Sequence, residues 1–134
     1  MIREIKQEDI PACVAIIRRS FMTVAEEFGF TVENAPRFTA FATTEERLLW
    51  QMENEERLMF VDEEAGVLRG YYSLLLQENK ECELNNLAVL PEYRHLGIGG
   101  KMLKHAHEVA REKGCRAINI GIVEIGRASC RERV

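Results

Sequence analysis

The stretch that decides the fold is Asn85-Asn-Leu-Ala-Val-Leu-Pro-Glu-Tyr-Arg-His-Leu-Gly-Ile-Gly-Gly-Lys-Met-Leu-Lys104. It predicts an apolar strand that ends at Val89, a proline turn, and a helix that begins in a glycine cluster. The first N–H groups of a helix have no partner within the helix, and its dipole is positive at that end. Because Gly97, Gly99 and Gly100 carry no Cβ atom, an anion can approach their backbone closely. The stretch therefore predicts a cradle for a phosphate group.

Apolar spacing on both sides of this stretch predicts one domain with the order β-α-α-β-β-β-α-β. The expected strands are residues 2–6, 58–61, 68–76, 83–89 and 117–123. The expected helices begin at residue 10, at residue 43 or 44, and at about residue 97, the last running to Lys113. A strand–helix–strand unit joins its two strands in parallel, so the last two strands make the sheet mixed. The predicted fold class is α/β, in the form of an α+β mixed sheet with helices packed on it.

Local signals predict where these helices begin and end. Asp9 is the expected N-cap of the first helix, and Gly29 is its expected stop. Thr43 or Thr44 caps the second helix, with Glu46 at capping-box distance from Thr43. Residues 30–41 are expected to form a loop or a short irregular helix.

Composition narrows the classes of function. The 134 residues are 46% hydrophobic with a net charge of −4, which argues against sequence-independent nucleic-acid binding. No apolar run approaches the roughly 18 residues of a membrane span, so we expect a soluble, cytoplasmic protein without a membrane partner. The cysteines and histidines show no metal-ligand spacing, and we assign them no chemistry and no metal.

The last residues, Glu124 to Val134, have no helical or strand periodicity and carry three Arg and two Glu. They resemble one translation frame of a common short-read sequencing adapter. We therefore expect residues 1–123 to be an incomplete domain and residues 124–134 to be a non-native tail; the alternative is a basic, disordered native tail.

Three phosphate-binding patterns compete for the glycine cluster. A P-loop would need glycine at His95, and both a P-loop and a dinucleotide fingerprint would need a different residue at Met102. The pattern that fits is Arg-x-x-Gly-x-Gly, from Arg94 to Gly99. A tight connection without a ligand is the alternative, but three glycines at a helix start cost about 1 kcal/mol each in helix propensity.

With this motif, residues 1 to about 123 resemble the GNAT superfamily of acetyl-CoA-dependent N-acetyltransferases. The resemblance implies that the strand backbone bonds the pantetheine arm of acetyl-CoA and that the loop holds the pyrophosphate. It also implies that the backbone N–H of Val89 contacts the oxyanion, and it implies no metal. The implied cofactor-binding residues are Leu87, Ala88, Val89, Arg94, His95, Leu96, Gly97, Ile98, Gly99, Gly100 and Lys101.

Acetyl transfer to an amine needs a base, because an alkyl ammonium is mostly protonated at neutral pH. Glu83 matches the position of the base glutamate in histone-type members of the family, although a solvent-facing strand glutamate is an equal alternative. Alternation places Glu83, Asn85 and Leu87 on one face unless a bulge near Asn85 and Asn86 changes the register. The resemblance places the general acid, a tyrosine, on a helix after Val123, beyond the expected truncation.

The acceptor is expected to be a small-molecule or peptide amine, contacted by the loop that holds Phe30 and Arg37, or else that loop packs on the core. The sequence does not select among such amines. The leading hypothesis is an N-acetyltransferase that works by direct attack in a ternary complex. The second is a truncated, non-catalytic coenzyme A-binding fragment, in which residues 117–123 form an uncovered apolar edge that favours a homodimer or aggregation.

Overall fold

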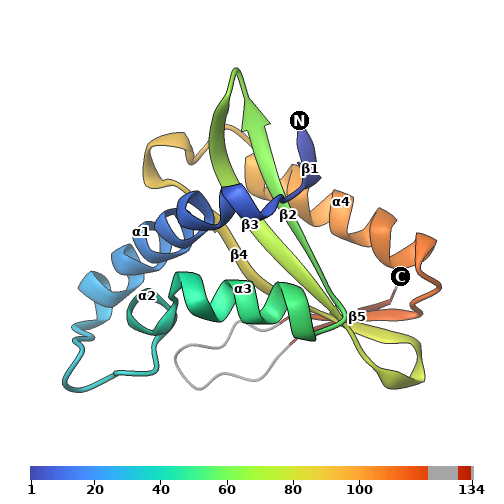
Figure 1. The fold of residues 1–134 in the computed structure, drawn as a ribbon, viewed down its shortest axis with the longest axis horizontal. Coiled ribbons are helices and arrows are strands. Elements are labelled where there is room, and N and C mark those ends of the chain that lie inside the picture. Colours follow the sequence, from blue (N-terminus) through green and yellow to red (C-terminus); the bar gives the residue numbers. More distant parts are fainter. Residues whose placement is uncertain (121–129, 134) are drawn as a thin grey trace.

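A computed structural model describes residues 1–120 and the backbone of residues 130–133. Its strands form one sheet with the order β1-β2-β3-β4-β5-β6, so each strand lies beside its neighbour in sequence (Figure 1). All neighbouring pairs are antiparallel except β4 and β5, which are parallel as the strand–helix–strand pattern predicted. The strands are β1 Ile2–Glu4, β2 Arg57–Glu64, β3 Val67–Leu76, β4 Glu81–Val89, β5 Ala117–Ile120 and β6 Cys130–Arg133.

The helices cover both faces of this sheet. The main ones are α1 Ile10–Phe28, the short α2 Thr39–Ala42, α3 Glu45–Asn54 and α4 Ile98–Glu112. Short 3₁₀ turns lie at Gln7–Asp9, Glu78–Lys80 and Pro91–Tyr93. α1 and α3 pack on one face and α4 on the other (Figure 1). The mixed α/β fold class is therefore confirmed.

Strand alternation divides the core into two layers. Tyr71 and Tyr72 are adjacent on β3 and both fully buried, but Tyr71 belongs to the layer under α1 and α3, whereas Tyr72 belongs to the layer under α4. The sheet is thus apolar on both faces, as expected for a sheet covered by helices on both sides.

The hairpin between β2 and β3 is tighter than the expected strands, residues 58–61 and 68–76, indicated. β2 continues through Glu64 and β3 begins at Val67, so the loop is Ala65-Gly66 alone. Both loop residues have positive φ, 52° and 81°, as a two-residue type I′ turn requires.

The expected cap positions are confirmed, but two expected side-chain interactions do not form. Asp9 is the N-cap residue of α1, yet its side chain makes no capping hydrogen bond; its carboxylate instead accepts from the Lys6 N–H at 2.7 Å and from the Arg3 guanidinium at 2.8 Å. At α3 the cap is Thr44, whose hydroxyl accepts from the N–H of Arg47, so the capping box with Glu46 does not form. The expected stop of α1 is confirmed, because Gly29 adopts a left-handed conformation with φ 70°.

The tail differs from expectation at its end. Residues 130–133 form β6, paired antiparallel with β5 from Ile120↔Cys130 to Ala117↔Arg133. The expectation of no strand structure is therefore wrong for this segment, and the edge of β5 that was expected to be uncovered is paired along Ala117–Ile120. Residues 121–123 of the expected strand lie outside the described residues.

Candidate functional site

A bulge in β4 organises the site. The pairing with β3 shifts between Tyr71↔Ala88 and Ser73↔Asn85, so Asn86 and Leu87 together oppose one residue of β3. Asn86 has φ 55°, a left-handed conformation that asparagine tolerates better than most residues. Side chains before and after the bulge therefore follow different alternations.

The bulge separates residues that simple alternation groups together. Leu87 and Val89 pack with the core layer under α4, whereas Glu83 lines a pocket with residues of α2 and α3. Asn85 lines the same pocket as Glu83. The register change that the sequence left open thus occurs, and it puts Glu83 and Leu87 on opposite faces.

The predicted phosphate cradle is a pocket of about 440 Å³ at the start of α4. It is lined by Ser20, Leu87, Val89, Tyr93, Arg94, His95, Gly97, Ile98 and Gly99. His95 and Gly97 have φ of 71° and 79°, so the loop turns through two left-handed residues immediately before the helix. A Cβ atom at Gly97 would meet nothing within 4 Å, so the space above this backbone is open. The pocket therefore presents the positive end of α4 to a ligand.

Arg94 holds the cradle against α1. Its guanidinium donates to the Ser20 carbonyl at 2.9 Å and to the Thr23 hydroxyl at 3.2 Å. A second link, from Arg19 of α1 to Glu92 at 2.8 Å, joins the same two segments at the surface. The family resemblance implied that Arg94 binds the cofactor; its contacts here position the loop, while the residue also lines the pocket.

The other predicted cofactor residues lie around this pocket or away from it. Ala88 is buried in the layer under α1, and Leu96 is 59% exposed. A Cβ atom at Gly100 would meet open space. Lys101 lines a different pocket, with Asp62 and Arg69.

A second pocket, of about 290 Å³, lies on the other side of the bulge. Its lining is strongly polar: Arg37, Thr39, Ala42, Thr43, Arg47, Gln51, Arg57, Glu83, Asn85 and Asn86. The structure thus brings together Glu83 and Arg37. Phe30 is placed elsewhere, with its ring 5.0 Å from that of Phe38 in an aromatic cluster.

A chain of hydrogen bonds holds the Glu83 carboxylate in place. The Asn85 amide donates to the Glu83 carboxylate at 2.7 Å and accepts from Arg57 at 2.9 Å. Arg57, whose side chain is only 7% exposed, also donates to Ser73 and forms an ion pair with Glu55, both at 2.8 Å. Sequence reasoning missed Arg57 and Asn85, because the contact joins β2 to β4 and no local pattern reports it.

The linings of the two pockets adjoin along β4. Asn86 lines the polar pocket, and Leu87, the next residue, lines the cradle. The bulge is therefore the part of β4 that the two linings share.

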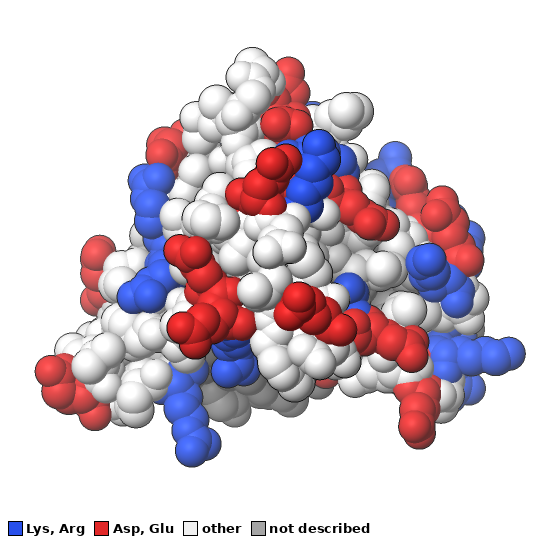
Figure 2. All heavy atoms as spheres, viewed as in Figure 1, with Lys and Arg blue, Asp and Glu red and all other residues white. Residues whose placement is uncertain are grey.

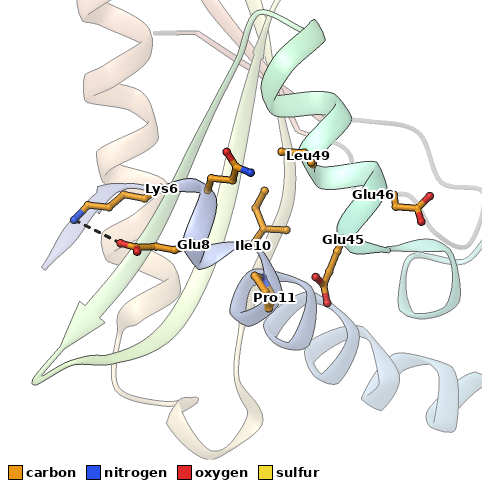
Figure 3. Close-up of a pocket in the computed structure, with 8 residues that line it drawn as sticks. Lys6, Glu8, Ile10, Pro11, Glu45, Glu46 and Leu49 are labelled. Atoms are coloured by element: carbon orange, nitrogen blue, oxygen red, sulfur yellow. Dashed lines mark ion pairs between the residues drawn. The ribbon is translucent and has the colours of Figure 1, made fainter.

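A third pocket, of about 770 Å³, lies between the start of α1 and α3 (Figure 3). Glu8, Glu45 and Glu46 line it beside the apolar side chains of Ile10 and Leu49. Acidic side chains also gather along α3 on the surface shown in Figure 2. None of the residues of the glycine motif lines this 770 Å³ pocket.

Buried thiols near the site are protonated at neutral pH. Burial raises the pKa of Cys13 and of Cys82 to about 12. Because the thiolate is the nucleophile, neither is suited to covalent catalysis. Within residues 1–120 and 130–133, no group of three or more His, Cys, Asp or Glu is placed to hold a metal ion. Among those same residues, no helix is long and apolar enough to cross a bilayer.

Comparison with known proteins agrees with this geometry. Residues 21–131 match the model of the acetyltransferase (GNAT) family, and the chain belongs to that family. The N-acetyltransferase PaiA of Thermoplasma acidophilum, solved with coenzyme A, has a TM-score of 0.76 at 22% identity, covering 90% of this chain and 77% of that one. A GNAT acetyltransferase of Brucella melitensis, solved with acetyl-CoA, has a TM-score of 0.70 at 20% identity, covering 92% and 76%. At these identities the likeness concerns the fold.

A curated relative is similar over a shorter region. Thialysine N-epsilon-acetyltransferase of Bos taurus is 35% identical over 54 residues. This region is 40% of the present chain and 32% of the bovine protein, so the match spans about a third of that relative.

Proposed function

We propose that this chain moves an acetyl group from acetyl-CoA to a primary amine by direct attack in a ternary complex. The observation that carries the proposal is that consecutive residues of the β4 bulge, Asn86 and Leu87, line two pockets of different chemistry. One pocket offers the N-terminus of a helix and an open glycine, which suit a phosphate. The other offers a carboxylate held in place, which suits an amine. The bulge contributes a residue to the lining of each pocket.

The cradle residues fit the pyrophosphate of acetyl-CoA. Gly97 leaves room that a side chain would occupy, and the first N–H groups of α4 point out of the helix without intrahelical partners. When bound, acetyl-CoA supplies an activated acetyl thioester. Leu87 and Val89 line the path from the cradle to the bulge, where the pantetheine arm would lie. The Val89 backbone N–H remains our candidate contact for the oxyanion.

Glu83 is the proposed general base. The amine nitrogen must lose a proton as it bonds to the acetyl carbon and the bond from that carbon to sulfur breaks; Glu83 takes this proton, directly or through water. Because Asn85 donates to the Glu83 carboxylate, it fixes the direction in which the free lone pairs point. The bovine relative's name gives a side-chain nitrogen of thialysine as its acceptor, and this supports an amine acceptor here.

The test is the Glu83→Gln variant with Glu78→Gln as its matched control. Glu78 is an exposed carboxylate that does not line the polar pocket. We expect Glu83→Gln to lower kcat by about 10² and most strongly at low pH, where the amine is most protonated, and Glu78→Gln to behave as wild type. An unchanged pH profile removes Glu83 from the mechanism. Coenzyme A binding without turnover of any amine would instead favour the non-catalytic fragment.

A further inference from the structure

The polar pocket concentrates positive charge in a chain whose net charge is −4. Of the residues that the structure describes, three arginines line it, from three separate segments: Arg37, Arg47 and Arg57. The carboxylate in this described part of the lining is that of Glu83. A primary amine approaching Glu83 therefore does so past an excess of guanidinium groups, which repel a ligand that carries positive charge alone.

Arg57 is not available to a ligand. Its guanidinium is already occupied by Glu55, Ser73 and Asn85, and the side chain is buried beneath the pocket. The excess charge that a ligand meets therefore belongs to the other two arginines.

Arg37 and Arg47 are exposed at the rim. Within residues 1–120 and 130–133, neither guanidinium has an ion pair or a hydrogen bond to another residue. Both can therefore form charge-assisted, two-pronged hydrogen bonds with a carboxylate or a phosphate without first giving up a partner.

Helix α3 carries a basic residue on one side and acidic residues on the other. Arg47 and Gln51, one turn apart, line the polar pocket. Glu45 and Glu46 line the large pocket on the other side, as Figure 3 shows. The carboxylates of this acidic helix are thus absent from the lining of the pocket that contains Glu83, and its arginine is present there.

From this arrangement we propose that the acceptor carries an anionic group, a carboxylate or a phosphate, in addition to its amine. Arg37 and Arg47 bind the anionic group while the amine lies at Glu83. The pocket volume, about 290 Å³, is at the lower end of the range for small-molecule sites. The acceptor is therefore a small amine that carries a carboxylate or a phosphate. This inference rests on the proposed function, because it describes the acceptor of the same reaction.

Matched pairs of acceptors test the proposal. The purified chain with acetyl-CoA is offered 4-aminobutyrate against 4-aminobutanamide, and O-phosphoethanolamine against ethanolamine, with release of the coenzyme A thiol as the readout. At least one anionic member should exceed its neutral partner about tenfold in kcat/KM, and the two pairs separate carboxylate from phosphate. Equal rates within both pairs would overturn the inference while leaving acetyl transfer intact.

The Arg47→Gln variant tests whether the preference for anionic acceptors arises in the polar pocket. Arg111→Gln, on α4, is the control. We expect Arg47→Gln to abolish the preference by raising KM for the anionic acceptor, with the neutral acceptor unaffected, and Arg111→Gln to keep it. A preference that survives Arg37→Gln/Arg47→Gln would refute the assignment.

A binding measurement separates this inference from the proposed function. If no amine is acetylated, saturation-transfer NMR with coenzyme A present still shows whether O-phosphoethanolamine or 4-aminobutyrate binds. Binding that Arg47→Gln removes supports the anion site although transfer has failed. No binding of either anionic probe overturns the site.

Discussion

Replacing Gly97 by alanine tests whether the cradle needs glycine for its left-handed backbone conformation or for the space that a side chain would occupy. Gly97 has φ 79°, and a Cβ atom there would meet nothing within 4 Å. The cost of Gly97→Ala therefore comes from the left-handed backbone, which is unfavourable for an L-residue by about 1–2 kcal/mol. With an unfolding entropy of about 2.1 cal/mol/K per residue, this chain should lose about 4–7 °C in Tm.

The same substitution three residues later should have the opposite sign. Gly100 lies in the first turn of α4 with negative φ, and a Cβ atom there would enter open space. Alanine is favoured over glycine in a helix by up to about 1 kcal/mol, so Gly100→Ala should raise Tm by about 2–4 °C. The two variants make the same chemical change, and only the backbone conformation distinguishes them.

Thermal unfolding followed by circular dichroism, with and without acetyl-CoA, measures both effects. For wild type, ligand at a hundred times its Kd should add about 2.7 kcal/mol. The decrease in Tm caused by Gly97→Ala should be at least as large with acetyl-CoA as without it. A loop that relaxes out of the left-handed conformation also moves the N–H groups that face the phosphate. A Gly97→Ala variant as stable as wild type would refute the left-handed turn, and an unchanged Tm of wild type in saturating acetyl-CoA would refute the cradle.

Two further predictions concern the helices that support the site. The pKa of Asp9 is held below its ordinary value mainly by the hydrogen bond from Arg3, so its contribution is complete above about pH 3.9 and is lost as the pH falls through the lowered pKa. Asp9→Asn should therefore lower the free energy of unfolding by about 1 kcal/mol at pH 7, measured as a lower Tm, and this difference should shrink as the pH falls through the lowered pKa of Asp9; a pH-independent difference would contradict the ion pair. Thr44→Ala should cost about 1 kcal/mol of unfolding free energy in urea titration through loss of the α3 cap, and a neutral result would show that the cap is elsewhere.

The strand, turn and helix that form the proposed cradle could be predicted from sequence because they are contiguous. The strand, the proline turn and the glycine cluster lie between Asn85 and Lys104, and the backbone preferences of glycine and proline act over a few residues. The fold class followed for a similar reason, since apolar periodicity reports which face of each element is buried. The caps were less secure: Thr43 and Thr44 differ by one position, and tertiary packing decides between them.

The polar pocket is a product of long-range contacts. Arg37, Arg47, Arg57 and Glu83 come from a loop, a helix and two strands, and only the order of the sheet brings them together. In the sequence, each of these residues taken alone is an ordinary charged residue. Their common environment, with Arg57 buried and paired and the rim arginines unpaired within the described residues, has no local signature in the sequence.

The bulge in β4 links the two halves of the site and explains why they differ. In a regular strand, Glu83, Asn85 and Leu87 would point to one face, and Glu83 would share that face with Leu87 of the cradle. The extra residue at Asn86 changes the alternation, so Glu83 and Asn85 line the pocket with α3, whereas Leu87 and Val89 pack in the layer under α4. Each pocket then keeps its own chemistry, one charged and one apolar with a helix terminus, although consecutive residues of β4 line the two. In the proposed reaction, this short departure from regular pairing lets one strand contribute both to the acceptor pocket and to the acetyl-CoA cradle.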